Sequence, residues 1–127
     1  NPMKLAVIIP GALDEEGLRL RVNHILQFSS TNTDIIPLTF KKEPKGIKTG
    51  ADVSLLSVET MELAMASEGQ GADAIVLHGI CDFGLEAARG AVDIPVVGLG
   101  SAAIHLARQL ADSFGVVSKS DATIPEF

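Results

Sequence analysis

The sequence predicts an α/β protein, a flavodoxin-like three-layer sandwich in which helices cover both faces of a parallel sheet of about five strands. Short apolar runs alternate with segments whose apolar residues recur at helical spacing, and turns rich in Gly, Ser and Pro separate them. Runs that are apolar on both faces are typical of strands buried in a parallel sheet, and right-handed strand–helix crossovers build such a sheet. We therefore expect residues 1–127 to form one α/β domain without an internal linker.

The first strand and the first helix are clearly marked. Lys4 to Ile9 (KLAVII) is a continuous apolar run, closed by Pro10 and Gly11. Asp14 is placed to cap the helix that follows, because an aspartate side chain accepts hydrogen bonds from the first free N–H groups of a helix. Apolar residues then recur at helical spacing, at Leu18, Val22, Ile25 and Leu26.

A second strand is predicted from Asp34 to Phe40, and a second helix from Ser54 to Ala66. Pro37 lies inside this strand and indicates a sheet edge, because proline has no N–H to donate to a neighbouring strand. The buried stripe of the helix is expected at Leu56, Met61, Leu63 and Ala64.

The second half of the chain is predicted to contribute three strands and two helices. The strands are expected at Ala74–Leu77, Ile94–Leu99 and Phe114–Val117. Asp82 or Phe83 begins the first of these helices, which runs through Val92. Ser101 is expected to cap the second helix. That helix carries its apolar residues at Ile104, Leu106, Ala107 and Leu110.

Composition excludes several classes of function. The formal net charge is -6 at pH 7, and the lysines between Lys41 and Lys48 are interrupted by Glu43, Pro44 and Gly46, so no basic face for a nucleic acid is expected. No apolar run is long enough to span a bilayer, and the start of the chain does not resemble a signal peptide. A single cysteine cannot form an internal disulfide, which fits the cytoplasm. No metal-ligand spacing and no dinucleotide fingerprint occurs, so neither a metal nor a cofactor is expected.

Candidate binding residues gather at the predicted carboxyl ends of the strands, where open parallel sheets bind ligands. These ends are rich in Gly and Ser, which make tight turns in any α/β protein but also let a ligand approach the backbone. Helix N-termini add free N–H groups that attract anions, which suits a small carboxylate. The turns in question are Pro10–Gly11, His78–Asp82, Gly98–Ser101 and Ser118–Ser120.

Cys81 and His78 are the candidate catalytic residues. Cys81 is the only cysteine and follows the third predicted strand directly. Helix N–H groups would stabilise its thiolate, whereas the neighbouring carboxylate of Asp82 would disfavour it, and a small buried apolar role is the alternative. His78 ends a buried strand and is either a proton carrier or a residue of the rim.

Six segments of the chain together form a recognisable pattern: DAIVLHG from Asp73, ICDFGLEAAR from Ile80, VDIPVVGLGSAA from Val92, IHLA from Ile104, FGVVS from Phe114 and ATIP from Ala122. They resemble the aspartate/glutamate/hydantoin racemase superfamily, most closely its hydantoin racemase branch. Its members share a strand ending in a cysteine, a turn and helix of the form FGDPGLDAAR, and a VDIPVVGIGEAA strand, turn and helix. The resemblance implies one lobe of a two-lobe, cofactor-independent isomerase that moves a proton at the carbon alpha to a carboxyl or carbonyl group.

The resemblance also implies which residues form the site. The Gly79–Ile80 turn and Ser118 match the carboxylate-binding positions of the family, and we add Pro10, Gly11 and Lys119 from the neighbouring strand ends as substrate-binding residues. The catalytic cysteine of the family falls at Gly79, while Cys81 occupies the place of a glycine. Such enzymes take one cysteine from each lobe, so this chain is expected to need a second lobe or a homo-oligomer.

Other functions stay open from the sequence. A related decarboxylase or isomerase lobe fits the glycine at position 79, because arylmalonate decarboxylases similarly lack the first cysteine. A non-catalytic module that binds small anions fits the fold with the thiol pair lost. A response-regulator receiver fits the length and Lys119, but Pro10-Gly11 stands where an acidic pair is needed, and His78-Gly79 where a phosphoacceptor aspartate is needed.

Overall fold

A computed structural model describes residues 1–41 and 48–118. Lys42, Lys45 and Lys119 lie outside the described residues. The helices and strands alternate along the chain, as the sequence predicts. Their bounds are β1 Met3–Ile9, α1 Glu15–Leu26, β2 Thr33–Thr39, α2 Gly50–Gly69, β3 Ala74–Leu77, α3 Leu85–Ala91, β4 Val96–Gly98 and α4 Leu99–Leu110.

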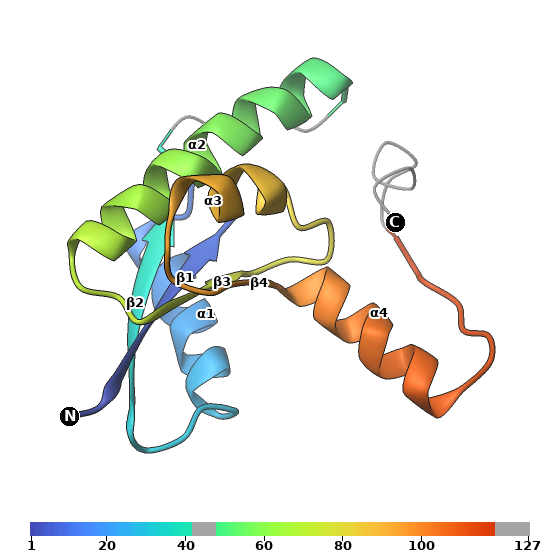
Figure 1. Ribbon diagram of the computed structural model, residues 1–127, viewed down its shortest axis with the longest axis horizontal. Coiled ribbons are helices and arrows are strands. Elements are labelled where there is room, and N and C mark those ends of the chain that lie inside the picture. The colour runs from blue at the N-terminus through green and yellow to red at the C-terminus, as the bar shows by residue number, and fades with distance from the viewer. Residues whose placement is uncertain (42–47, 119–127) are drawn as a thin grey trace.

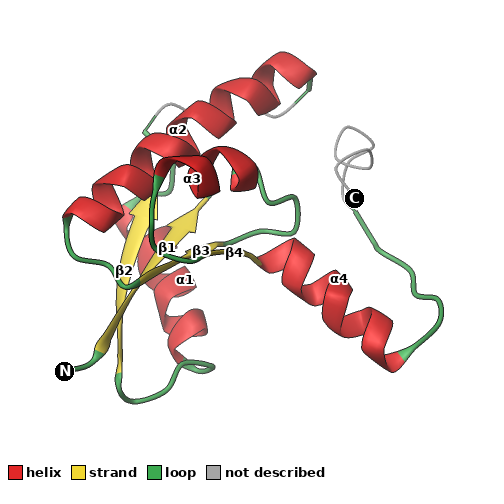
Figure 2. Cartoon of the chain, in the orientation of Figure 1, coloured by secondary structure: helices red, strands yellow, loops and turns green. Residues whose placement is uncertain are grey.

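The strands form one parallel sheet in the order β2-β1-β3-β4. This order is that of the first four strands of a flavodoxin-like sheet. Figures 1 and 2 show α2 and α3 above the sheet and α1 below it, so the predicted three layers are confirmed. Parallel strands that run side by side bring their carboxyl ends to one edge, which positions the turns after β1 and β3 together.

Pro37 confirms the predicted sheet edge. It lies in β2, whose one neighbour in this sheet is β1, and it pairs with Val7. Because the outer side of an edge strand has no ladder to complete, the missing N–H of proline costs nothing there. Asp14 is likewise confirmed as the cap of α1, since its carboxylate accepts from the Gly17 N–H at 2.8 Å.

The hydrophobic core lies between the sheet and the helices α2 and α3. Residues from Ala6 to Ile9 on β1 are buried on both faces, as expected for an inner parallel strand. On the face toward α2 and α3 the buried residues include Ile8, Ile75, Leu77, Leu56, Ala64 and Ala88.

Helix α2 is longer than predicted and buries a partly polar stripe. Leu56 and Ala64 are buried as expected, while Met61 and Leu63 are half-buried. Two hydroxyl residues, Thr60 and Ser67, take the other buried places at helical spacing. Sequence reasoning omitted them because polar residues are rarely buried unless a partner is at hand.

The predicted fifth strand at Phe114–Val117 is wrong, because the described sheet has four strands and these residues have no strand structure. In Figure 1, α4 leads away from the sheet and the segment after it does not return to β4. Val117 is 98% exposed, so an apolar, β-prone segment here lacks the neighbour that a strand needs. The fourth strand is also shorter than predicted, at Val96–Gly98.

Helix α2 begins with a reciprocal cap that sets a pH-dependent stability. The Thr49 hydroxyl accepts from the Asp52 N–H, and the Asp52 carboxylate accepts from the backbone N–H groups of Thr49 and Lys48, both at 2.9 Å. These N–H groups hold the pKa of Asp52 below its ordinary 3.8. Since the pKa is lower in the folded state, the carboxylate stabilises the fold above its unfolded pKa and loses that effect in acid.

We expect Asp52→Asn to lower the melting temperature at neutral pH, with the difference from the unaltered chain closing as the pH falls below 3.8. Thermal unfolding followed by circular dichroism between pH 7 and pH 2 measures this. Glu62→Gln, which alters an exposed carboxylate on the same helix, is the matched control. A deficit of equal size at every pH would contradict the assignment.

Candidate functional site

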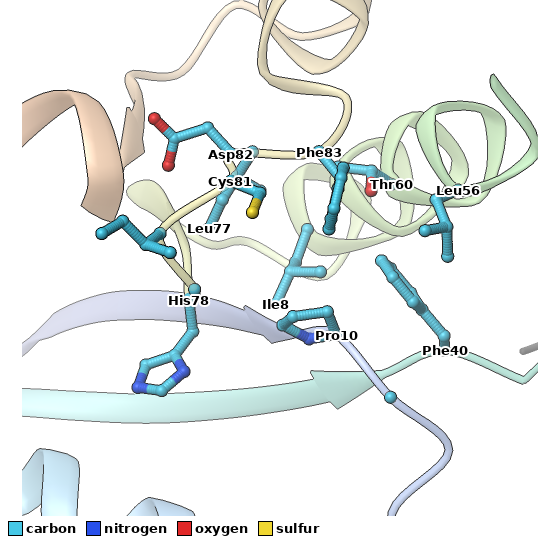
Figure 3. A pocket seen from close by; sticks show the side chains of 13 residues that line it. Ile8, Pro10, Phe40, Leu56, Thr60, Leu77, His78, Cys81, Asp82 and Phe83 are labelled. Atoms are coloured by element: carbon cyan, nitrogen blue, oxygen red, sulfur yellow. The ribbon is translucent and has the colours of Figure 1, made fainter. Parts of the chain in front are cut away.

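A pocket of about 280 Å³ opens at the carboxyl end of β1 and β3. Apolar side chains form much of its wall: Ile8, Phe40, Leu56, Leu77 and Phe83. The rim consists of the turns that follow the two strands (Figure 3). An apolar hollow with a few polar groups at its mouth is the usual form of a site for a small molecule.

The pocket brings together six of the eight residues expected from the sequence. These are Pro10, Gly11, His78, Gly79, Ile80 and Cys81. Ser118 is not one of the lining residues. It ends the described segment after α4, and Figure 1 shows this segment running apart from the sheet. Lys119 lies outside the described residues.

Two glycines shape the rim through backbone conformations that L residues rarely adopt. Gly11 has a φ of 114° and Gly79 a φ of 117°. A Cβ at Gly79 would also lie 3.3 Å from Cγ of Pro10. Any side chain at position 79 is therefore strained.

Cys81 is half-buried on the rim, and Figure 3 shows its sulfur turned toward the pocket, while the carboxylate of Asp82 is turned the other way. The side chains of these two consecutive residues therefore point into different environments. The sequence left open whether the Asp82 carboxylate disfavours the thiolate of Cys81. In the structure this carboxylate is directed toward α4.

The Asp82 carboxylate caps the N-terminus of α4, although Asp82 lies well before that helix in the sequence. Its oxygens accept from the Gly100 N–H at 2.9 Å and from the Ser101 N–H at 2.7 Å. The expected cap by Ser101 is therefore wrong, as α4 begins at Leu99 and Ser101 lies within it. The expected start of α3 at Asp82 or Phe83 is wrong too, because Asp82 adopts a φ of 50°, outside helical geometry, and α3 begins at Leu85.

This cap explains the glycines of the Gly98–Ser101 turn. A Cβ on Gly98 would lie 2.5 Å from the Asp82 carboxylate, and a Cβ on Gly100 would lie 1.8 Å from the backbone oxygen of Ile80. The turn was expected to offer its N–H groups to an anionic ligand. Two of those groups are already bound to a carboxylate of the protein itself, so the glycines here serve the approach of the Ile80–Asp82 loop.

His78 borders the pocket, but its ring is directed away from it (Figure 3). Successive residues of a strand face opposite sides, so Leu77 faces the pocket and the next side chain faces α1. Burial, and then electrostatic interaction with Arg21 and His24 on α1, lower the pKa of His78 below 6.5. The lowered pKa favours the neutral imidazole.

Thr60, Phe83 and Phe40 line the pocket but were not singled out from the sequence. Thr60 stands four residues after Leu56 on α2, so helical spacing was the signal that could have placed it on the same face. In residues 1–41 and 48–118, no group of three His, Cys, Asp or Glu residues is arranged to hold a metal ion. Nor is any helix in that part of the chain long and apolar enough to cross a membrane.

Comparison with known proteins identifies relatives of this chain. The family model described as Asp/Glu/Hydantoin racemase matches residues 21–127. The chain is 32% identical to a hydantoin racemase from Pseudomonas sp. (strain NS671) over 91% of its own length and 46% of that protein. It is 30% identical to a hydantoin racemase from Rhizobium meliloti over 98% of its length and 48% of that protein. The chain therefore spans about half the length of the curated relatives it matches.

Solved structures agree with the fold. An allantoin racemase from Klebsiella pneumoniae superposes with a TM-score of 0.74 at 25% identity, over 84% of this chain and 43% of that one. An allantoin racemase from Pseudomonas fluorescens superposes with a TM-score of 0.81 at 22% identity, over 96% of this chain and 52% of that one.

The contact between Gly100 and Ile80 gives a sharp test of the loop packing. We expect Gly100→Ala to lower the free energy of unfolding by at least about 3 kcal/mol, because two backbones would have to separate. Gly90→Ala is the control, since a Cβ there meets nothing within 4 Å inside α3, and should be neutral or stabilising by about 0.5–1 kcal/mol. Urea unfolding of both variants measures the difference. Similar stabilities for the two would refute the close approach.

We further expect Asp82→Ala to lower the free energy of unfolding by about 1–2 kcal/mol, through loss of a helix cap. Asp82→Asn keeps one acceptor oxygen and should fall in between. Amide hydrogen exchange provides a local readout, since the Gly100 and Ser101 N–H groups should exchange faster in the alanine variant. Unchanged protection of these two amides would contradict the cap.

Proposed function

We propose that this chain, which belongs to the Asp/Glu/hydantoin racemase family, forms one wall of a racemase site. Cys81 is the group that would move a proton at the carbon alpha to a carboxyl or carbonyl group. The observation that carries the proposal is the thiol of the chain's single cysteine, turned into an apolar pocket at the carboxyl end of the sheet.

Proton transfer at such a carbon needs a base that takes the proton and donors that stabilise the enolate or enediolate left behind. A thiolate performs the first task without a cofactor: its sulfur takes the proton, the C–H electron pair forms a double bond to the carbonyl carbon, and the C=O π pair moves onto the oxygen. Apolar walls favour this step because they exclude water, which would weaken the interaction of the developing charge with its donors. Backbone N–H groups of the Gly79–Ile80 turn, which lines the pocket, are our candidates for those donors.

Cys81 is the base in this proposal, although the catalytic cysteine of the family aligns with Gly79. The positive φ of Gly79 disfavours any side chain there, and Cys81 is the thiol on the same rim. His78 is the weaker candidate because its ring is turned from the pocket. A related decarboxylase is the second candidate function, and the glycine at position 79 is the observation that favours it.

Racemisation needs an acid on the face of the substrate opposite the base. We infer that this acid comes from a second lobe or from a second copy of the chain, in keeping with the half-length match to the relatives. Relatives named hydantoin racemase and allantoin racemase point to a substrate with a hydantoin ring. Thiol chemistry without a disulfide suits the reducing cytoplasm.

The test is exchange of the α-proton of a 5-substituted hydantoin in deuterium oxide, followed by NMR. We expect exchange with the unaltered chain and a loss of about 10²-fold or more with Cys81→Ala, because the base is removed. Exchange should outpace racemisation when a single face carries the base.

Alkylation with iodoacetamide supplies a second readout, since Cys81 is the one thiol that can react. Labelling of the unaltered chain should abolish exchange, while the same treatment of Cys81→Ala changes nothing further. Equal exchange rates for the unaltered chain and Cys81→Ala would exclude Cys81 as the base.

A further inference from the structure

The hydroxyl of Thr60 is a polar group that the proposed chemistry does not use. Thr60 is 1% exposed and contributes to the pocket wall from α2. Its Oγ1 has no hydrogen-bond partner among residues 1–41 and 48–118. Buried polar atoms without a partner are rare in native proteins and require a specific reason.

The Thr60 hydroxyl differs from the serine hydroxyls of the same helix, α2. Ser54, Ser57 and Ser67 each donate to the backbone oxygen four residues earlier, at 3.0, 2.9 and 2.7 Å. This local bond is the ordinary way in which a helix satisfies a hydroxyl. Thr60 does not make it, although it lies in the same helix.

The described side chains beside Thr60 in the pocket wall offer its hydroxyl no other hydrogen-bond partner. Phe40, Leu56 and Phe83 are apolar, and Gly84 packs so closely that a Cβ there would lie 2.8 Å from the Thr60 Cβ. A partnerless hydroxyl in such a place costs stability, because it loses its bonds to water without replacement. A ligand in the pocket that carries a polar atom would restore the lost bond once the Thr60 side chain turns its hydroxyl toward that atom.

We propose that Thr60 is a specificity-determining residue, whose hydroxyl binds a carbonyl or N–H group on the substituent of the ligand. This inference rests on the proposed function, which supplies the hydantoin ring that carries the substituent. The hydroxyl can donate to a carbonyl oxygen and accept from an N–H, so an amide or ureide substituent suits it. An alkyl substituent leaves the hydroxyl unsatisfied, so this pocket discriminates against it.

The experiment compares two probes, a hydantoin with a ureido group at ring carbon 5 and a hydantoin with an isobutyl group there. Binding to the chain is measured by calorimetry, and thermal unfolding is measured alongside. We expect the ureido probe to bind more tightly. Thr60→Val keeps the shape of the side chain and removes the hydroxyl. It should lower the affinity for the ureido probe about tenfold relative to the affinity for the isobutyl probe. Its melting temperature should be unchanged or higher.

Two further variants serve as controls. Thr60→Ser keeps the hydroxyl and should restore the preference for the ureido probe. Ser67→Ala removes a buried hydroxyl that already has a partner, so it should lower the melting temperature and leave the preference intact.

The outcomes separate this inference from the proposed function. A clear fall in the melting temperature of Thr60→Val would mean that the hydroxyl has a partner within the protein, and would overturn the inference. Equal weakening of both probes, or binding of neither, would overturn it as well. Hydroxyl-dependent binding without α-proton exchange would leave Thr60 in its role and refute the racemase proposal instead.

Discussion

The contact on which the site depends is the pair of hydrogen bonds from the start of α4 to the carboxylate of Asp82. It joins the loop after β3 to the helix after β4, and so fixes the loop that carries Cys81. Gly98 and Gly100 have no Cβ where one would collide with this loop, and Asp82 adopts a left-handed conformation to reach the helix. A helix N-terminus attracts negative charge, and here the protein supplies that charge itself.

This constraint decides what the rim offers to a ligand. The N–H groups of Gly100 and Ser101 are bound to Asp82, so an anion would have to be held by other groups. The pocket that remains is apolar along its walls, with the thiol at its mouth and the Thr60 hydroxyl buried in the wall. Such a hollow suits a neutral ring with a polar substituent better than a bare carboxylate. The hydantoin with a polar substituent that we propose as substrate is of this kind.

Much of the fold was predictable because its signals are local. The unbroken apolar run of β1, the cap at Asp14 and the edge position of Pro37 follow from chemistry within one strand or one helical turn. The segment Phe114–Val117 has equally strong strand character but forms no strand. Whether a β-prone segment pairs depends on a neighbour, and α4 carries this one away from the sheet. Local pattern therefore predicted the elements well and their partners less well.

The order of elements, the parallel sheet, the family resemblance and the clustering of Pro10, Gly79 and Cys81 at one edge follow from the amino-acid sequence alone. Parallel strands bring their carboxyl ends together whatever the details of packing. Three features follow from tertiary packing instead: Asp82 turns toward α4, the His78 ring turns toward α1, and the Thr60 hydroxyl is buried without a partner among the described residues. Each of these depends on how elements distant in the chain pack together, and periodicity within one element carries no information about that.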